Sequence, residues 1–129
     1  MPPIENLLRV PPYHLGALER QGIFTTGLLL EVSETPTRRQ YLADQIGADI
    51  TDVMDWRDEA LLLNLANFGP TEQQEFIQAG ILGLTDLLAL DLAEFRRRLA
   101  LAAHYLGAEP PTDLMSEGWW EQAHTLREE

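Results

Sequence analysis

The chain has 129 residues, of which 45% are apolar, and its formal net charge is −12. This length and apolar content suit one globular domain with a buried core and exclude a disordered chain. The lack of cysteine excludes disulfides, thiolate catalysis and metal sites built from cysteine. The acidic charge disfavours binding to nucleic-acid phosphates and to anionic lipid, because both depend on basic groups.

The pattern of apolar residues predicts an all-α protein. No segment alternates apolar and polar residues with the period of two that marks a half-buried strand. The expected helices, in chain order, are residues 4–9, a helix from Pro12 that ends before Gly22, a short helix carrying Leu28, Leu29 and Leu30, residues 36–46, 49–65 and 70–79, a short helix around 86–90, a helix from Asp91 or Leu92 to Leu106, and a tail helix containing Trp119 and Trp120.

Residues typical of helix starts support these boundaries. Pro12, Pro36 and Pro70 each stand where the first turn of a helix tolerates proline. Asp49 and Asp52 place negative charge at the positive end of the longest expected helix.

Two Gly-Ile pairs, Gly22-Ile23 and Gly80-Ile81, lie in matching surroundings. Each pair follows a helix that begins at a proline, and each precedes a threonine and a run of leucines. Each glycine fits the position just past a helix end, where the backbone adopts a left-handed conformation. The following isoleucine can fold back onto the last helical turn. One helix–cap–helix unit is therefore expected to occur twice.

The spacing of four glycines extends this repeat. The interval from Gly47 to Gly107 is only slightly longer than the interval from Gly22 to Gly80, so the second copy holds a small insertion. Two copies are too few for a solenoid. The expected organisation is a single domain over residues 1–129, with pseudo-repeats at about 4–48 and 49–108 and a C-terminal tail helix in 109–129.

The order helix, hairpin, helix, Gly-Ile, Thr-x-x-Leu-Leu resembles helix-hairpin-helix units. Over roughly residues 7–106 the sequence is similar to a bacterial tandem helix-hairpin-helix family known as a domain of unknown function, number 4332. The matching residues are Arg39, Leu42, Ala43, Gly47, Trp56, Ala60, Leu61, Phe68, Gly69, Pro70, Gly80 and Ile81. The resemblance implies a compact all-α bundle of two helix-hairpin-helix (SAM-like) pseudo-repeats plus the tail helix.

The hairpins depart from those of DNA-binding members of this class. Such modules use a Gly-x-Gly hairpin whose backbone N–H groups hold a phosphate. The first unit has Arg9-Val10-Pro11 at these positions, without glycine, and Pro11 has no N–H to donate. The second unit has Asn67, Phe68 and Gly69, so one glycine remains. The sequences of these two hairpins therefore argue against phosphate binding.

Two features suggest binding to another protein. Trp119 and Trp120 point about 100° apart on a helix, so one is expected to pack on the core while the other either docks with the tail or contacts a partner. Arg96 and Arg97 belong to the sole run of three basic residues. This run either pairs with carboxylates of its own chain or docks an anion or a protein. Trp119, Trp120, Arg96 and Arg97 are the candidate partner-binding residues.

No residue set suggests catalysis. His14, His104 and His124 are the sole histidines, and their spacing matches no metal motif. The acidic residues between 49 and 59 could hold a hard cation weakly, but a solvated helix face also explains them. The sequence has neither a nucleophile elbow nor a glycine-rich phosphate loop. We therefore expect no catalytic residues, metal, cofactor or small-molecule substrate.

The sequence leads to two hypotheses of function. The first is a non-catalytic protein–protein interaction module, an adaptor or an assembly or regulatory factor. The alternative is a nucleic-acid-binding helix-hairpin-helix protein that uses Asn67, Phe68 and Gly69. The N-terminal residues lack the basic start and apolar stretch of a secretory signal. The longest apolar runs fall far short of the roughly 20 residues that cross a bilayer, so we expect a cytoplasmic protein without membrane insertion.

Overall fold

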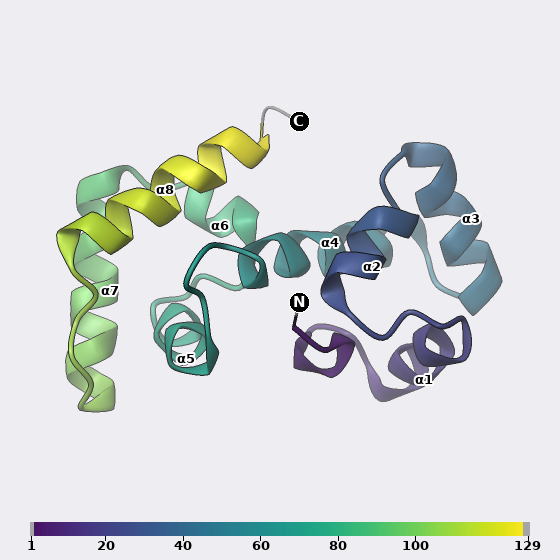
Figure 1. Ribbon diagram of the computed structural model, residues 1–129, viewed down its shortest axis with the longest axis horizontal. Coiled ribbons are helices and arrows are strands. Elements are labelled where there is room, and N and C mark those ends of the chain that lie inside the picture. Colours follow the sequence, from purple (N-terminus) through teal and green to yellow (C-terminus); the bar gives the residue numbers. More distant parts are fainter. Residues whose placement is uncertain (1, 128–129) are drawn as a thin grey trace. The chain divides into compact units, whose positions relative to one another are not determined.

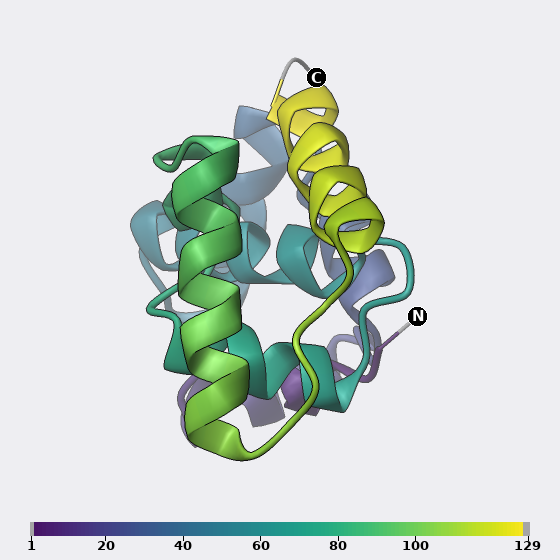
Figure 2. The same cartoon turned by 90° about the vertical axis from the view of Figure 1, so that its left-hand side faces the viewer.

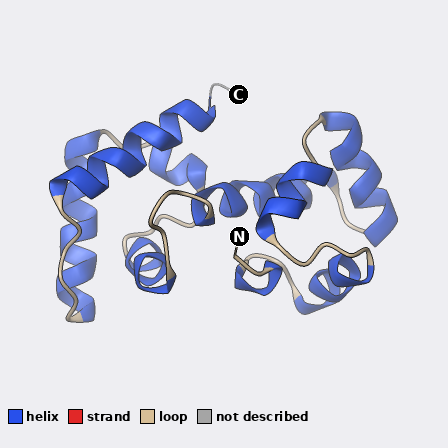
Figure 3. Cartoon of the chain, in the orientation of Figure 1, coloured by secondary structure: helices blue, strands red, loops and turns tan. Residues whose placement is uncertain are grey.

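The computed structural model describes residues 2–127, and the chain divides into two compact units, Met1–Asn64 and Leu65–Glu129 (Figure 1). Every regular element within the described residues is helical (Figure 3). The β-type pairing described there is one isolated bridge between Pro3 and Thr25. The predicted all-α class is confirmed.

The first unit is built around a central helix. Its elements are η1 (Ile4–Asn6), a short 3-10 helix, followed by α1 (Pro12–Arg20), α2 (Thr26–Val32), α3 (Pro36–Ile46) and α4 (Ile50–Leu63). Helix α4 packs against both α2 and α3, and α3 also contacts α1 (Figure 1). Leu18, Leu29, Val53 and Ala60 are fully buried, and Trp56 is 2% exposed. These apolar side chains form the core of the unit.

The second unit has the same kind of arrangement. Its helices are α5 (Pro70–Gln78), α6 (Leu84–Leu88), α7 (Leu92–Leu106) and α8 (Asp113–Arg127). Helix α8 packs against α6 and α7, and α5 packs against α7. The linker between α7 and α8 contains Pro110 and Pro111, and it runs back along α7 before α8 begins (Figures 1 and 2). Phe76, Phe95 and Leu87 are fully buried at the centre of this unit.

The predicted glycine caps are present in both units. Gly22 and Gly80 each have φ of 80°. The N–H of the following isoleucine donates to the carbonyl five residues earlier, at 3.0 Å for Ile23 and 2.8 Å for Ile81. Ile23 is 5% exposed and Ile81 is fully buried. Each isoleucine is therefore buried, and its backbone is hydrogen-bonded to the last turn of the preceding helix.

Several expected elements have different bounds, and two of them differ most. The helix expected at residues 4–9 is limited to Ile4–Asn6. The chain leaves the helix after Asn6 because the N–H groups of Leu8 and Arg9 donate to a side chain of α4 instead of to carbonyls of a continuing helix. The short helix expected around 86–90 is α6, which both begins and ends slightly earlier, at Leu84 and Leu88.

The division into units differs from the predicted pseudo-repeats. The sequence assigns residues 49–65 to the second pseudo-repeat, whereas α4 packs in the first unit. The predicted tail helix, α8, packs on α6 and α7 and so completes the second unit. Glycine caps mark helix ends and carry no information on which helices pack together, so they do not reveal these partners. A single domain over residues 1–129 stays a prediction.

No helix in the described part of the chain has the length and the apolar content needed to cross a bilayer.

Candidate functional site

The turn before α1, residues 8–11, is named hairpin 1, and it binds a carboxylate of its own chain. The N–H of Leu8 donates to Oε2 of Glu59 at 2.8 Å, and the N–H of Arg9 donates to Oε1 of Glu59 at 3.0 Å. Glu59 lies on α4 and is 4% exposed. Successive backbone amides that converge on one anion form the kind of concavity that binds phosphate in other proteins. Here the carboxylate of Glu59 fills that position.

The surroundings of Glu59 are acidic. The guanidinium of Arg9 lies 3.3 Å from the carboxylate of Asp55 and 3.5 Å from that of Asp58. Burial raises the pKa of Glu59, while the amide hydrogen bonds from Arg9 and Leu8 and the charge of Arg9 oppose that rise. The cation of hairpin 1 is thus held by carboxylates of α4, and this turn is a poor surface for a polyanion.

The turn before α5, residues 66–69, is named hairpin 2, and it is also closed by side chains of its own unit. The N–H of Ala66 donates to Oε1 of Gln122 on α8 at 3.0 Å. The carbonyl of Ala66 accepts the indole N–H of Trp119 at 2.7 Å. The N–H of Gly69 donates to Oε1 of Glu72 at 2.9 Å, as part of the N-terminal cap of α5. The amide of the one remaining glycine is therefore already engaged.

The structure brings Asn67, Phe68 and Gly69 together in this turn. Phe68 packs its ring edge-on against Phe76 and Trp119, with centroid distances of 4.9 Å and 6.3 Å. Asn67 is exposed and has φ of 58°, a left-handed conformation in which asparagine is enriched. The ring of Phe68 thus anchors hairpin 2 to the core of the second unit.

A family model described as Domain of unknown function (DUF4332) matches residues 12–126. The chain belongs to the DUF4332 family. The match includes hairpin 2, Glu59 and Gln122, whereas hairpin 1 lies immediately before it. The comparisons with curated proteins and with solved structures gave no significant match.

The tryptophan pair of this DUF4332 chain serves the second unit itself. Trp119 is 2% exposed and packs edge-on against Phe76, with a centroid distance of 5.4 Å. Trp120 is half-buried, and its indole N–H donates to the carbonyl of Leu90 at 3.1 Å. Its ring lies 4.1 Å from the ring of His124. Trp119 is thus the core member of the pair, and partner binding by Trp120 stays a prediction.

The arginine run on α7 pairs with carboxylates of the same unit. Arg97 donates from Nε and Nη2 to the two carboxylate oxygens of Glu94, at 2.8 Å and 2.6 Å. Arg98 donates to the same carboxylate from Nε at 3.1 Å. These hydrogen bonds lower the pKa of Glu94 to about 2. Arg96 lies 3.4 Å from Glu117 on α8. Such pairs are worth little at an exposed surface, and docking by Arg96 or Arg97 stays a prediction.

The other polar candidates of the DUF4332 chain also have internal contacts. The ring of His14 packs on Trp56 at a centroid distance of 5.3 Å. Asp49 and Asp52 form a capping box at the start of α4. Within the described residues, no group of three His, Asp or Glu side chains is arranged to hold a metal ion.

Sequence reasoning missed Glu59 and Gln122 as the side chains that close the hairpins. A signal for both exists, because Trp56-x-x-Glu59-Ala60 recurs in the second half of the sequence as Trp119-x-x-Gln122-Ala123. The repeat therefore extends from the glycine caps into α8. The backbone amides that donate to these two side chains also occupy repeated positions. The interval from Leu8 to Ala66 equals the interval between the two glycine caps, Gly22 and Gly80.

Proposed function

We propose that this chain is a non-catalytic protein-interaction module, an adaptor or assembly factor, built from two helix-hairpin-helix units and active in the cytoplasm. One observation carries the proposal. The backbone amides that would hold a phosphate in hairpin 1 are bound to Glu59, a buried carboxylate of the same chain. A module of this architecture whose Leu8 and Arg9 amides are already bound to its own carboxylate retains its other surfaces for binding to protein.

Hairpin 2 supports the same proposal. Its Ala66 and Gly69 amides donate to Gln122 and Glu72, and the Glu72 carboxylate stands beside the turn where a basic residue would favour a phosphate. Nucleic-acid binding draws most of its affinity from basic groups that displace counterions, and a net charge of −12 opposes it. Binding of nucleic acid through Asn67, Phe68 and Gly69 is therefore the weaker alternative.

The first experiment separates these two functions. The full chain is titrated against labelled single-stranded and duplex DNA at low salt and micromolar protein, and we expect no change in anisotropy. Glu59→Ala is the informative companion variant, because it frees the Leu8 and Arg9 amides and removes the competing carboxylate. Salt-dependent binding of DNA by the unmodified chain would contradict the proposal.

A second experiment identifies the partner. Proteins captured from the native cell are identified by mass spectrometry, and the strongest candidate is purified and mixed with the chain. We expect a complex of fixed stoichiometry in analytical ultracentrifugation. Trp120→Ala tests whether the half-buried indole contributes, with its melting temperature as the control for folding. Unchanged affinity in Trp120→Ala would remove α8 from the binding surface.

A further inference from the structure

We propose that a concave surface on α7, lined by Arg98, Leu101 and Tyr105, binds an acidic segment of a partner protein in which an apolar side chain neighbours the carboxylate. This inference rests on the proposed function, because it names the chemistry of the partner. It is carried by a cavity, by the unequal pairing of two arginines and by exposed apolar side chains.

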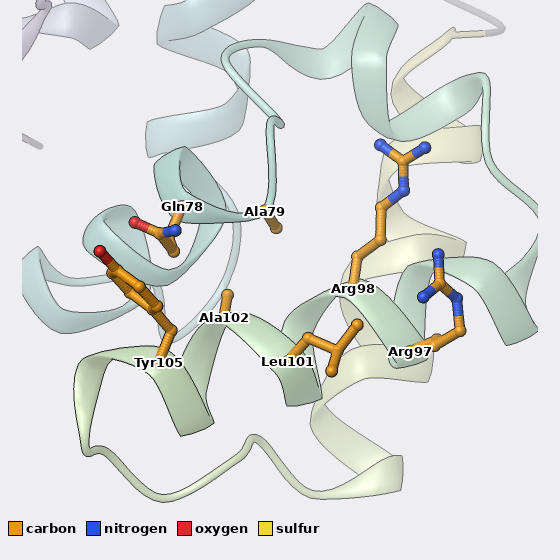
Figure 4. Close-up of a pocket in the computed structure, with 7 residues that line it drawn as sticks. All are labelled: Gln78, Ala79, Arg97, Arg98, Leu101, Ala102 and Tyr105. Carbon is orange, nitrogen blue, oxygen red and sulfur yellow. The ribbon is translucent and has the colours of Figure 1, made fainter.

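The cavity lies between the end of α5 and the outer face of α7, and its volume is about 370 Å³. Figure 4 shows Arg97 and Arg98 at one end and Gln78 and Tyr105 at the other, with Leu101 between them. The surface thus offers guanidinium donors at one end, and a phenol and a carboxamide at the other.

The two arginines differ in the donors that they leave available. Arg97 uses Nε and Nη2 for a two-point contact with Glu94. Arg98 gives Glu94 a single hydrogen bond from Nε, and its two Nη groups donate to no other side chain or carbonyl in the described part of the chain. Two guanidiniums therefore share one carboxylate, and Arg98 keeps donors suited to an incoming carboxylate.

Large apolar side chains adjoin these donors. Leu101 is 56% exposed and Tyr105 is 75% exposed. Positions 98, 101 and 105 follow the spacing i, i+3, i+7, which places them on one face of a helix. Leu101 and Tyr105 thus form an apolar strip beside the guanidinium of Arg98. This arrangement fits a peptide that carries a carboxylate next to a leucine or phenylalanine.

Charge complementarity selects an acidic protein segment as the occupant. The excess of guanidinium at this surface is local, because the chain as a whole carries a net charge of −12. A nucleic acid would extend its many phosphates over the surrounding acidic surface, whereas one peptide carboxylate need contact only the cavity. The apolar strip also favours a peptide over a free inorganic anion.

The first unit has an arginine at the corresponding position, which serves for comparison. Arg38 on α3 corresponds to Arg98, because the interval between them equals the interval from Gly47 to Gly107. Arg38 donates from Nη1 to the carbonyl of Glu31 at 3.4 Å and lies 3.9 Å from the carboxylate of Glu34. Arg38 occupies the matching place on α3 but does not line the cavity, so it is the matched control for Arg98.

The test uses a designed peptide with one carboxylate. The full chain, labelled with ¹⁵N, is titrated with the blocked peptide Gly-Ser-Leu-Asp-Leu-Phe-Ser-Gly, and a second peptide has Asn in place of Asp. We expect saturable shifts of the resonances of Arg98, Leu101 and Tyr105, with at least tenfold weaker binding of the Asn peptide. Arg98→Gln should weaken binding of the Asp peptide at least tenfold, Tyr105→Ala should weaken it less, and Arg38→Gln should leave it unchanged.

Three results would overturn the inference: equal binding of the two peptides, unchanged binding by Arg98→Gln, or no binding at millimolar peptide. Inorganic phosphate that reproduces the shifts with equal affinity would overturn it too, since the apolar strip would then contribute nothing. Tyr105 is exposed, so Tyr105→Ala is expected to fold even if Arg98→Gln does not. If a protein partner forms a stable complex whose affinity neither Arg98→Gln nor Tyr105→Ala changes, this site is not the binding surface, whereas the proposed function still holds.

Discussion

The two hairpins hold corresponding places before α1 and α5, but different chemistry closes them. Hairpin 1 directs two adjacent amides at a carboxylate, that of Glu59. Hairpin 2 directs one amide at the carboxamide of Gln122 and adds an indole N–H from Trp119 to the carbonyl of Ala66. The comparison shows that a turn able to hold an anion can instead fasten the last helix of its unit. The contact with the last helix is therefore made by an ionisable side chain, Glu59, in hairpin 1 and by a neutral one, Gln122, in hairpin 2.

The largest expected effect comes from the tryptophan that supports hairpin 2. Trp119→Ala removes a buried ring that contacts Phe68 and Phe76, together with its hydrogen bond to Ala66. We expect a loss of about 3–5 kcal/mol in the free energy of unfolding, measured with urea. Trp56→Ala, the matched change in α4, should have a similar cost. A loss below about 1 kcal/mol for Trp119→Ala would show that hairpin 2 does not depend on the ring.

The next effect concerns Glu59. Glu59→Ala leaves the part-buried amides of Leu8 and Arg9 without their acceptor, and each unsatisfied amide costs about 1–3 kcal/mol. Because both amides are only part-buried, we expect a total loss in the lower part of the summed range, about 2–4 kcal/mol, and faster hydrogen exchange at both amides. Slow exchange that persists at Leu8 and Arg9 in the variant would mean that another group holds hairpin 1.

A smaller effect is expected at Gln122. Gln122→Ala removes the acceptor of a single exposed amide, that of Ala66, and one such hydrogen bond contributes about 0.5–1.5 kcal/mol. Faster exchange should be confined to Ala66. If Gln122→Ala costs as much as Glu59→Ala, the carboxylate has no advantage over the carboxamide, and the comparison fails.

The smallest effect is a dependence on pH that comes from the carboxyl group of Glu59 at hairpin 1. Burial raises the pKa of Glu59 above its ordinary value of 4.5, so the folded protein binds this proton more tightly than the unfolded chain does. The stability that this carboxyl contributes therefore decreases as the pH rises from 4.5 through the raised pKa. We expect the unfolding free energy of the unmodified chain, minus that of Glu59→Gln, to decrease over this window and to level off above it.

Glu94 titrates in the opposite sense, and the comparison with Glu59→Gln removes its contribution. Its pKa is lowered to about 2 by Arg97 and Arg98, so its contribution is present above the ordinary value of 4.5 and is lost as the pH falls towards 2. Both proteins retain Glu94, so its contribution cancels in the difference. A difference that increases with pH above 4.5 would contradict the direction of the Glu59 shift.

Much of the fold could be predicted because its signals are local. A proline in the first turn of α1, α3 and α5, and a glycine after each of four helices, limit the backbone within a few residues of themselves. The inward position of one tryptophan followed from the angle of about 100° between neighbouring helical residues. Which of the pair would be buried did not follow, because that depends on how α8 rotates against α6 and α7.

The site was harder to predict because it depends on residues far apart in the sequence. Glu59 is distant along the chain from the amides of Leu8 and Arg9, and on α4 it is one acid among several. Glu59 belongs to the repeated motif Trp-x-x-Glu/Gln-Ala. The meaning of this repeat becomes clear once α4 and α8 are known to be the last helices of their units. The expected helix over residues 4–9 was wrong for the same reason, since a distant carboxylate took the amides that would have continued it.

The sequence by itself determined the helical class, the four helix ends marked by glycine and the acidic charge. The first two depend on neighbouring residues, and the charge is a sum over the residues. The tertiary structure decided which helix closes each unit, which tryptophan enters the core and which carboxylate occupies hairpin 1. Burial and hydrogen bonding at these places are set by contacts between segments distant along the chain. A buried amide requires an acceptor, and only folding selects which of many acids supplies it.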